Sequence, residues 1–422
     1  MTPSDFTPSF ELALQTAQHR FPRLSMIRSK ANPDDRLHLA APSITAPSFY
    51  LLDVTMVGGK PRLIEANGSN GALSSTVAAG DHLRARHMAF AFESKVRPAG
   101  PVSVLLCHQE GFLHLPEFFG RAELFKDELS LCHDAAVRGC DEDPGTEAIT
   151  IVCGSTADVA AMTARRGSEL FYKGRPVVFA SNPNLVPELA RQGVISRIGD
   201  AYDIDLGFFH EGDGTLLIHN KAGQQDVAAG TGIVPLACRL AHSREGWMDA
   251  VEWFRSRNLA CVGKLHSASG GTGIEMVRPD MTDAECDKVH DRILAAGAEK
   301  YGVAVAQTAY PIALFEFADS DPVVLAGAQH RWDLRVMALV YPGGVDTYPC
   351  VGRLCPAPIN ASWSRDTWVS NLSGRDGAAA MKFLRTPSEL GLGQEAIQRI
   401  LGSCAEWSVA AAQWRPEGGL VS

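Results

Sequence analysis

The chain has 422 residues, of which 45% are hydrophobic and 21% are charged, and its formal net charge is -9. A chain of this length and composition is expected to fold into two or three packed units with a large apolar core. The negative charge argues against general binding to nucleic acid or to an anionic membrane, although a local basic cleft can still bind a phosphate-bearing ligand.

The cysteines and the apolar segments indicate a cytoplasmic protein. Ten cysteines are dispersed along the chain without a C-x-x-C pattern, which is typical of reduced thiols in a protein core. Cys350 and Cys355 have a spacing that can bind metal, but a structural zinc site needs a second pair of Cys or His ligands nearby. No stretch resembles a Sec signal peptide or is apolar for long enough to span a bilayer. We therefore expect neither export nor membrane insertion.

The first part of the chain predicts a helix followed by a β-hairpin. Apolar residues recur with helical spacing over residues 6–21. Two apolar stretches, Ser48–Val57 and Pro61–Ala66, flank Gly58-Gly59. This pattern predicts two strands joined by a tight glycine turn.

Residues 75–94 have a helical pattern. After them, residues 96–220 alternate short apolar strands with helices. This alternation predicts a parallel, doubly wound α/β unit. The expected strands and helices are, in chain order, Val102–Cys107, Pro116–Glu128, Ala148–Cys153, Ala157–Arg166, Tyr172–Ser181, Leu185–Gln192 and Leu206–Ile218.

Residues 221–385 have strands joined by turns rather than by crossover helices, so we expect an α+β region with antiparallel pairing. Residues 386–422 are expected to form a C-terminal helical cap. The expected elements of the two regions are the helix Asp283–Tyr301, the strands Val303–Ala309, Ile312–Ala318 and Trp332–Tyr341, and the helix Ser388–Trp414. The predicted fold class is therefore α/β together with α+β.

A glycine-dense loop follows an apolar strand in the segment Lys264–Ile274. Glycines let backbone N–H groups approach phosphate oxygens, the lysine adds a positive charge, and hydroxyls can donate further hydrogen bonds. The pattern predicts a site for a nucleotide triphosphate. A tight hairpin turn between Leu259–Leu265 and Ile274–Val277 is the alternative. The candidate phosphate-binding residues are Lys264, Ser267, Ser269, Gly270, Gly271, Thr272 and Gly273.

The predicted hairpin ends in Glu65-Ala66-Asn67. Residues two apart on a strand point the same way, so a carboxylate and an amide oxygen lie on one face. Such a pair suits a magnesium ion that keeps waters and bridges phosphates. Asp53, on the preceding strand, could lie across the hairpin and add a carboxylate. The alternative is a strand that ends at a polar turn.

Arg331, Asp333 and Arg335 alternate along an apolar strand and therefore share one face. Two guanidiniums around one carboxylate form either a solvated ion network or a phosphate clamp, and both alternatives stay open. Arg353 follows the next strand and could join the same face.

Two further charged residues are candidates for the site. Lys221 lies where the α/β unit meets the following region, so it either reaches into an interdomain cleft or lies on the surface of a linker. Glu316 is a lone carboxylate in a nearly continuous apolar run. Burial of an unpaired charge is costly, so Glu316 must be paired or functional.

Together these motifs resemble the ATP-grasp superfamily, in which two α+β subdomains clamp ATP and activate a carboxylate as an acyl-phosphate. Because Glu65-Ala66-Asn67 precedes Lys264–Gly273, the order resembles the circularly permuted form, which is similar to eukaryotic-type glutathione synthetase and to bacterial permuted ATP-grasp proteins. The resemblance implies four parts: a helix and metal-binding hairpin, an inserted pre-ATP-grasp-like α/β domain, a nucleotide-binding region and a helical cap, in residues 1–95, 96–220, 221–385 and 386–422.

The resemblance also implies roles for single residues. Glu65 and Asn67 would bind Mg²⁺, and Lys221 and Lys264 would contact the nucleotide phosphates or adenine. The loop Ser267–Gly273 would cover the phosphates.

The resemblance also implies a role for Glu316 and a third metal ligand. Glu316 would lie near adenine and ribose. Glutathione synthetase carries a metal-binding glutamate in its glycine loop, whereas this chain has Ala268. A third metal ligand must then come from elsewhere, and Asp53 is the candidate. This departure makes glutathione itself a poor candidate for the product.

The implied activity is ATP-dependent ligation of a small carboxylate to an amine, of amino-acid or peptide type, with release of ADP and phosphate. Arg335 and Arg353 would stabilise the tetrahedral oxyanion and the phosphate. The implied cofactors are ATP and Mg²⁺, and a homodimer is compatible with the sequence. Two alternatives stay open: a kinase-like phosphotransferase, and a non-catalytic nucleotide-binding scaffold subunit, which is favoured if the missing loop glutamate means that Mg²⁺ is not held.

Overall fold

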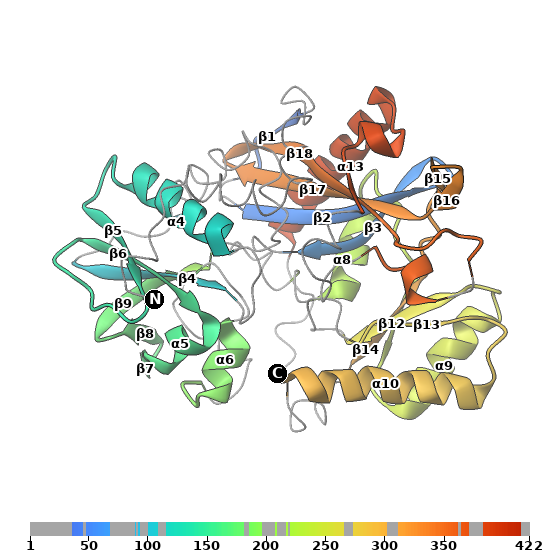
Figure 1. The fold of residues 1–422 in the computed structure, drawn as a ribbon, viewed down its shortest axis with the longest axis horizontal. Helices are drawn as coiled ribbons and strands as arrows, with labels where there is room; N and C mark the ends of the chain where they lie inside the picture. Colours follow the sequence, from blue (N-terminus) through green and yellow to red (C-terminus); the bar gives the residue numbers. More distant parts are fainter. Residues whose placement is uncertain are drawn as a thin grey trace.

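A computed structural model describes residues 36–44, 48–67, 89, 92, 100–108, 115–180, 185–195, 207–208, 217, 220–265, 273–301, 311–361, 364–370 and 383–414. Within these residues the chain is a mixed α/β protein with three larger sheets and one two-stranded sheet (Figure 1). All ten cysteines are free thiols, in agreement with the sequence-based expectation. In the described part of the chain, no helix is long and apolar enough to cross a membrane.

The first sheet is antiparallel and joins strands from both ends of the chain. It consists of β1 (Leu37–Ala41), β2 (Ser48–Val57), β3 (Lys60–Asn67), β17 (Trp332–Tyr341), β18 (Gly343–Leu354) and β19 (Leu384–Arg385). The strand order is β1-β18-β17-β2-β3, with β19 beside β18. Strands β2 and β3 form the predicted hairpin. Gly58 and Gly59 at its turn have φ angles of 58° and 72°, which explains why glycines occupy the turn.

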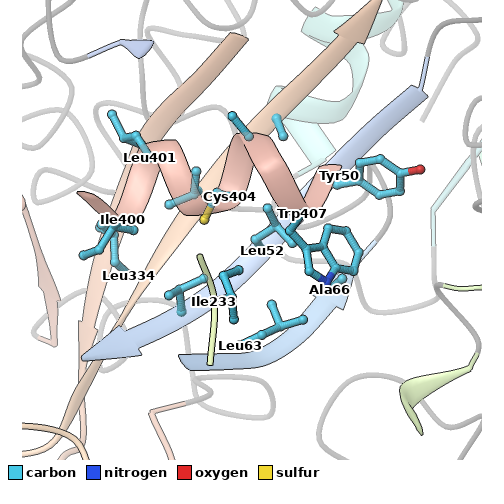
Figure 2. Close-up of a cluster of buried hydrophobic side chains, with 14 of the residues drawn as sticks. Tyr50, Leu52, Leu63, Ala66, Ile233, Leu334, Ile400, Leu401, Cys404 and Trp407 are labelled. Carbon is cyan, nitrogen blue, oxygen red and sulfur yellow. The ribbon is translucent and has the colours of Figure 1, made fainter. Parts of the chain in front are cut away.

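Both faces of the first sheet are covered, which explains why its central strands are apolar on both sides. Helix α13 (Gln394–Gln413) lies on one face, and Figure 2 shows Ile400, Leu401 and Cys404 directed at the strands. The ring of Trp407 meets the ring of Tyr50 edge-on, with 5.4 Å between the centroids. The other face contributes to a buried cluster that it shares with the second sheet.

The second sheet has a parallel core, as the alternation of strands and helices predicts. It consists of β4 (Val102–His108), β5 (Ala135–Gly139), β6 (Ile149–Ser155), β7 (Thr163–Arg166), β8 (Glu169–Tyr172), β9 (Arg175–Ala180) and β10 (Gly207–Phe208). Strands β5, β6, β4, β9 and β10 are parallel neighbours in that order. Helix α4 (Leu115–Leu129) packs on one face, and α5 (Thr156–Ala161) and α6 (Leu185–Arg191) pack on the other.

Two predicted elements of the second sheet are wrong in extent. The helix predicted over Ala157–Arg166 ends at Ala161, and Thr163–Arg166 forms strand β7 instead. The strand predicted over Tyr172–Ser181 is broken by a turn at Lys173-Gly174, whose φ angles are 44° and 81°. Strands β7, β8 and β9 pair as successive antiparallel hairpins. This pairing overrides the helix propensity of the alanines and arginines in the first segment.

Glu147 holds an unusually short connection in the second sheet. Strands β5 and β6 are parallel neighbours joined only by residues 140–148, whereas such connections commonly need about a dozen residues or more. The Glu147 carboxylate accepts hydrogen bonds from Arg138 Nε at 2.7 Å and Nη2 at 3.0 Å, from Gly145 N at 3.0 Å and from Thr150 Oγ1 at 2.8 Å. The bonds from Arg138 make the largest contribution to a pKa of Glu147 well below its usual value.

The third sheet is antiparallel, as predicted for residues 221–385. It consists of β11 (Cys238–Ala241), β12 (Cys261–Leu265), β13 (Glu275–Val277) and β14 (Ile312–Glu316), in the order β11-β14-β12-β13. Helices α9 (Arg244–Arg255) and α10 (Asp283–Tyr301) cover one face, and α10 has the predicted bounds. Strands β15 (Val323–Leu325) and β16 (Ala328–His330) form the two-stranded sheet.

Several predicted elements lie wholly or mostly outside the described residues. They are the helices over residues 6–21 and 75–94, the strand Val303–Ala309 and most of Leu206–Ile218. The helix predicted over Ser388–Trp414 begins later, at Gln394, after a short 3-10 turn, η5 (Ser388–Leu390).

The hydrogen bonds of Glu147 predict a pH-dependent contribution to stability. At about pH 7, Glu147→Gln should lower the free energy of unfolding by about 2 kcal/mol, because the neutral amide loses the charge-assisted bonds from Arg138. The pKa of Glu147 is depressed in the folded state. The wild type should therefore lose this stability as the pH falls below about 4.3, the usual pKa of glutamate, and the difference between the two proteins should shrink. Urea unfolding at about pH 7 and pH 3 measures both effects.

Glu142→Gln is the matched control, because the Glu142 carboxylate lies 3.7 Å from Nη1 of the same Arg138 and is more exposed. It should change the free energy of unfolding by less than about 0.5 kcal/mol. Equal losses in the two variants would contradict the role of Glu147.

Candidate functional site

The candidate site begins at the end of the β2–β3 hairpin, where two carboxylates face each other. Asp53 and Glu65 are directly opposite in the register of β2 and β3, which confirms the expected position of Asp53 across the hairpin. Asn67 lies two residues beyond Glu65, and its Nδ2 donates to Asp53 Oδ2 at 3.2 Å. Like charges directly opposite destabilise a sheet unless other groups compensate them. The surrounding cations provide that compensation.

Two arginines of the first sheet bind Asp53. Arg335 lies opposite Asp53 in the pairing of β17 with β2, and its Nε and Nη2 donate to Oδ1 and Oδ2 at 2.8 and 2.9 Å. Arg353 Nη2 lies 2.9 Å from Oδ2. Burial alone would raise the pKa of Asp53, which is 4% exposed, but Arg335 and Arg353 outweigh it and lower the pKa to about 2.

Asp333 binds Arg353 from its other side. The two residues are partners in the pairing of β17 with β18, and Arg353 Nε donates to Asp333 Oδ1 at 2.6 Å. Ser370 Oγ donates to the second oxygen of Asp333. Burial raises the pKa of Asp333 above its usual value. Arg331 instead pairs with Asp319, with 2.7 Å between Nε and Oδ1. The predicted grouping of Arg331 and Arg335 around Asp333 is therefore wrong: a buried ion network exists, but Arg335 and Arg353 share Asp53, and Asp333 binds Arg353.

Lys221 reaches Glu65 from a helix beside β3. Helix α8 (Lys221–Ala228) begins after Asn220, whose Oδ1 accepts a hydrogen bond from Gly223 N at 2.8 Å. Lys221 is 5% exposed, and its Nζ lies 3.1 Å from Glu65 Oε1. Lys221 is therefore a buried residue of this cluster and not a surface residue of a linker.

Lys264 approaches the same glutamate from the third sheet. It is 8% exposed, and its Nζ lies 4.7 Å from the centroid of the Phe315 ring on the neighbouring strand β14. Burial lowers the pKa of Lys264, and Lys221 lowers it further, whereas Glu65 opposes both. Burial alone would raise the pKa of Glu65, but Lys221 and Lys264 together lower it. Glu65 therefore interacts with one cation from helix α8 and one from the third sheet.

Glu316, at the end of β14, is paired as expected for an acid in an apolar run. Its Oε2 accepts a hydrogen bond from Ala237 N at 3.2 Å and lies 4.0 Å from Arg62 Nη1. The side chain of Glu316 is 25% exposed. A role for this residue beside adenine stays a prediction.

Most of the glycine loop lies outside the described residues. Strands β12 and β13 on either side of the loop pair antiparallel, so a turn and a phosphate-binding loop both remain compatible with the described part. Gly273 has a φ of +61°, and a Cβ there would lie 3.0 Å from the Ile293 carbonyl oxygen, so this position favours glycine. The predicted loop residues that lie outside the described chain are Ser267, Ser269, Gly270, Gly271 and Thr272.

The described residues fit a magnesium ion only in part. Among them, no group of three or more His, Cys, Asp or Glu side chains could hold a metal ion. Both oxygens of Asp53 are bound by Arg335, Arg353 and Asn67. Glu65 is bound through Oε1 and Asn67 through Nδ2. Glu65 and Asn67 are two residues apart on β3 and share one face, so Glu65 Oε2 and Asn67 Oδ1 are the oxygens that would hold a magnesium ion there.

The sequence did not point to Gln224 and Gln225, which fix α8 to β3. Both are buried, with exposures of 1% and 4%, and two consecutive glutamines within a short, otherwise mostly small or apolar helix were the available signal. Two cavities, of about 440 and 180 Å³, lie elsewhere, and the predicted site residues do not line them.

No family model matches this chain, and no curated protein matches it. Solved structures similar to it include the following two. One is a provisionally assigned gamma-glutamylcysteine synthetase from Methylobacillus flagellatus KT, with 11% identity, coverage of 95% of this chain and 93% of that chain, and a TM-score of 0.47. The other is a glutathione synthetase-like effector from Globodera pallida in its apo form, with 11% identity, coverage of 84% and 81%, and a TM-score of 0.39. Likeness at this level supports no conclusion about activity.

The buried ion network predicts a large effect of Asp53→Asn. The substitution leaves Arg335 and Arg353 without their shared anion, so it should lower the free energy of unfolding by about 3 kcal/mol at about pH 7. The pKa of Asp53 is about 2 in the folded protein. The stability that depends on its charge is therefore present above the unfolded pKa of about 3.9 and is lost as the pH falls toward 2. Denaturant unfolding across this pH range measures the loss.

Asp346→Asn provides the control in the same sheet, because this aspartate pairs with the half-exposed His38 rather than with a buried arginine. It should change the free energy of unfolding by less than about 1 kcal/mol. An Asp53→Asn protein as stable as this control would show that the arginines do not depend on Asp53.

Proposed function

We propose that this protein is an ATP-dependent carboxylate–amine ligase of the circularly permuted ATP-grasp type. The observation that carries the proposal is the convergence of Lys221, from helix α8, and Lys264, from the third sheet, on Glu65. Two nearly buried lysines beside one carboxylate form a cationic centre that suits the phosphates of a nucleotide.

The cluster has an excess of positive charge before any ligand binds. Its cations are Lys221, Lys264, Arg335 and Arg353, and its carboxylates are Asp53, Glu65 and Asp333. Four positive and three negative groups leave one net positive charge. The side chain of Glu65 is 20% exposed and that of Asp53 only 6%, so a phosphate-bearing ligand can approach Glu65 and the lysines without opening the arginine network.

In the proposed reaction a substrate carboxylate oxygen attacks the γ-phosphorus of ATP, the bond to the β-phosphate oxygen breaks, and ADP leaves. An amine then attacks the acyl carbon and loses a proton, and phosphate leaves as the amide forms. A bound magnesium ion would neutralise phosphate charge, held by Glu65 and Asn67. Lys221 and Lys264 bind and orient the phosphates. Such chemistry depends on positioning and electrostatics and needs no protein nucleophile.

In this proposal the arginines present oriented N–H donors to the reacting groups. Arg335 uses Nε and Nη2 to bind Asp53, and Arg353 uses Nε for Asp333 and Nη2 for Asp53. The remaining Nη1 group of each guanidinium can donate to a developing oxyanion or to the leaving phosphate. Asp53 then orients the arginines and is not a metal ligand.

The proposal includes features that rest on sequence resemblance. They are the four-part division at residues 95, 220 and 385 and the role of Glu316 near adenine. The proposal also includes a cytoplasmic location, which rests on the dispersed cysteines. The substrates are small carboxylates and amines of amino-acid or peptide type. Nucleic acid and membranes are not partners in this proposal, and a homodimer is compatible with it.

A non-catalytic nucleotide-binding scaffold is the second candidate. It is favoured by Ala268 in the glycine loop, where the resemblance expects a metal-binding glutamate. A kinase-like phosphotransferase shares the first half of the reaction and differs only in the need for an amine.

Nucleotide binding can be tested by thermal unfolding of the full chain with and without magnesium and a non-hydrolysable ATP analogue. A ligand that binds only the folded state raises the apparent melting temperature. We expect an upward shift in the wild type that depends on magnesium and is lost in Lys264→Met. Lys60→Met, which removes an exposed lysine from the hairpin that carries Glu65, should keep the shift. The absence of any shift in the wild type would overturn nucleotide binding.

Ligase activity can be tested by the release of ADP from ATP with mixtures of amino acids and small peptides. A ligase should release ADP only when acid and amine are both present, and hydroxylamine should trap the acyl-phosphate as a hydroxamate. Glu65→Gln should lower turnover at least about 100-fold, because it weakens both metal binding and the placement of the lysines. A phosphorylated product that forms without amine indicates the kinase-like alternative. Nucleotide binding without any turnover indicates the scaffold.

A further inference from the structure

The outer edge of β3 is covered by two glutamine side chains of α8. Gln224 Oε1 accepts a hydrogen bond from Ala66 N at 2.9 Å, and Gln224 Nε2 donates to Ala66 O at 3.0 Å. This pair of bonds is the one that a neighbouring strand would make with an edge residue. Gln225 Nε2 donates to Leu63 O at 3.1 Å, and its Oε1 accepts from Leu236 N at 2.8 Å. The side chains of α8 thus take the place of a further strand at this edge.

The contact made by Gln224 fixes the helix beside the catalytic carboxylate. Ala66 follows Glu65 directly in β3, and Gln224 follows Lys221 by three residues, so the two helix residues lie on the same side of α8. A slip of the helix by one turn would move Lys221 by about 5.4 Å. Such a slip would break the 3.1 Å contact between Lys221 Nζ and Glu65 Oε1.

The bonds of Gln224 specify one position of α8 along β3, because the side-chain amide must satisfy both its donor and its acceptor. Its side chain is 1% exposed, so water does not compete for Ala66 N or O. Other positions of the helix would leave buried polar groups without partners, which is costly. Gln225 makes its bonds at Leu63 O and Leu236 N and so joins β3 to the chain after α8, whereas Gln224 binds both backbone groups of the residue next to Glu65.

We propose that Gln224 is a positioning residue that sets the place of Lys221 and, through it, the affinity of the site for the phosphates of a nucleotide. This inference rests on the proposed function of the same site. Gln225 secures the same helix without controlling Lys221. The two neighbouring glutamines therefore have different effects when they are replaced, although each loses hydrogen bonds to backbone groups: Gln224 those to Ala66 and to Leu217 O, and Gln225 those to Leu63 and Leu236.

Gln224→Met and Gln225→Met form the matched pair for the test, since methionine is close to glutamine in size and cannot make the two bonds. Each full-length variant is titrated with a fluorescent ATP analogue and magnesium, and its melting temperature is measured. Gln224→Met should weaken nucleotide binding about tenfold relative to the wild type. Gln225→Met should lower the melting temperature by a similar amount but change the affinity less than twofold. Equal affinities in the two variants would overturn the proposal.

A second measurement does not depend on nucleotide binding. The rate of acetylation of Lys221 by an amine-selective reagent, followed by mass spectrometry, reports how firmly its Nζ is held beside Glu65. The rate should rise at least about fivefold in Gln224→Met and stay near the wild-type rate in Gln225→Met. An unchanged rate in Gln224→Met would contradict the positioning role, even if the wild type binds no nucleotide. If nucleotide binding fails while the acetylation result holds, only the proposed function is lost.

A milder variant covers the case in which Gln224→Met does not fold. Gln224→Asn keeps the amide but shortens its reach by one carbon, so it cannot make both bonds to Ala66 from the same helix position. It should raise the acetylation rate of Lys221 and weaken nucleotide binding in the same direction. Wild-type values in both assays would count against the proposal.

Discussion

The structure depends on one electrostatic constraint, the opposition of Asp53 and Glu65 across the first hairpin. Two carboxylates in this register repel each other, so each needs cations of its own. Asp53 binds arginines from β17 and β18, and Glu65 interacts with lysines from α8 and β12. The cations come from segments that are far apart in the sequence. The opposed acids thus bring together the first sheet, the helix beside it and the third sheet.

The two acids differ in how open they are, and this difference divides their tasks. Asp53 is enclosed by three donors, and its low pKa keeps it charged under all ordinary conditions. Its role is to fix the arginines. Glu65 has a side chain that is one-fifth exposed, and its partners are lysines on long, flexible stems. In the proposed site, an anionic ligand can therefore displace the Glu65 carboxylate from the lysines, whereas it cannot reach the bonds that hold Asp53.

Local sequence patterns predicted the parts of the fold that are decided locally. The glycine turn between Ser48–Val57 and Pro61–Ala66 predicted the hairpin, and strict periodicity predicted Asp283–Tyr301 as a helix with its observed bounds. Strand β7 was predicted as helix, because its pairing with β8 is not visible in its own residues. In the same way, alternation along one strand grouped Arg331 with Arg335. In the structure, Arg353 rather than Arg331 joins Arg335, because the registers of β17 with β2 and with β18 decide which side chains meet. Gln224 could not be predicted for a related reason, since its hydrogen bonds to Ala66 form only where α8 meets the edge of β3.

The charge balance of the cluster limits how the cations can act on a reacting phosphate. Asp53 and Asp333 together neutralise Arg335 and Arg353, so the arginine pair brings oriented N–H groups but little net charge. The net positive charge arises where two lysines share the single carboxylate of Glu65. In the proposed reaction, charge that develops during phosphoryl transfer would be balanced mainly at the lysines and at a bound magnesium ion, while the arginines would supply oriented donors. In this proposal, the placement of Lys221 therefore matters more than the number of cations in the cluster.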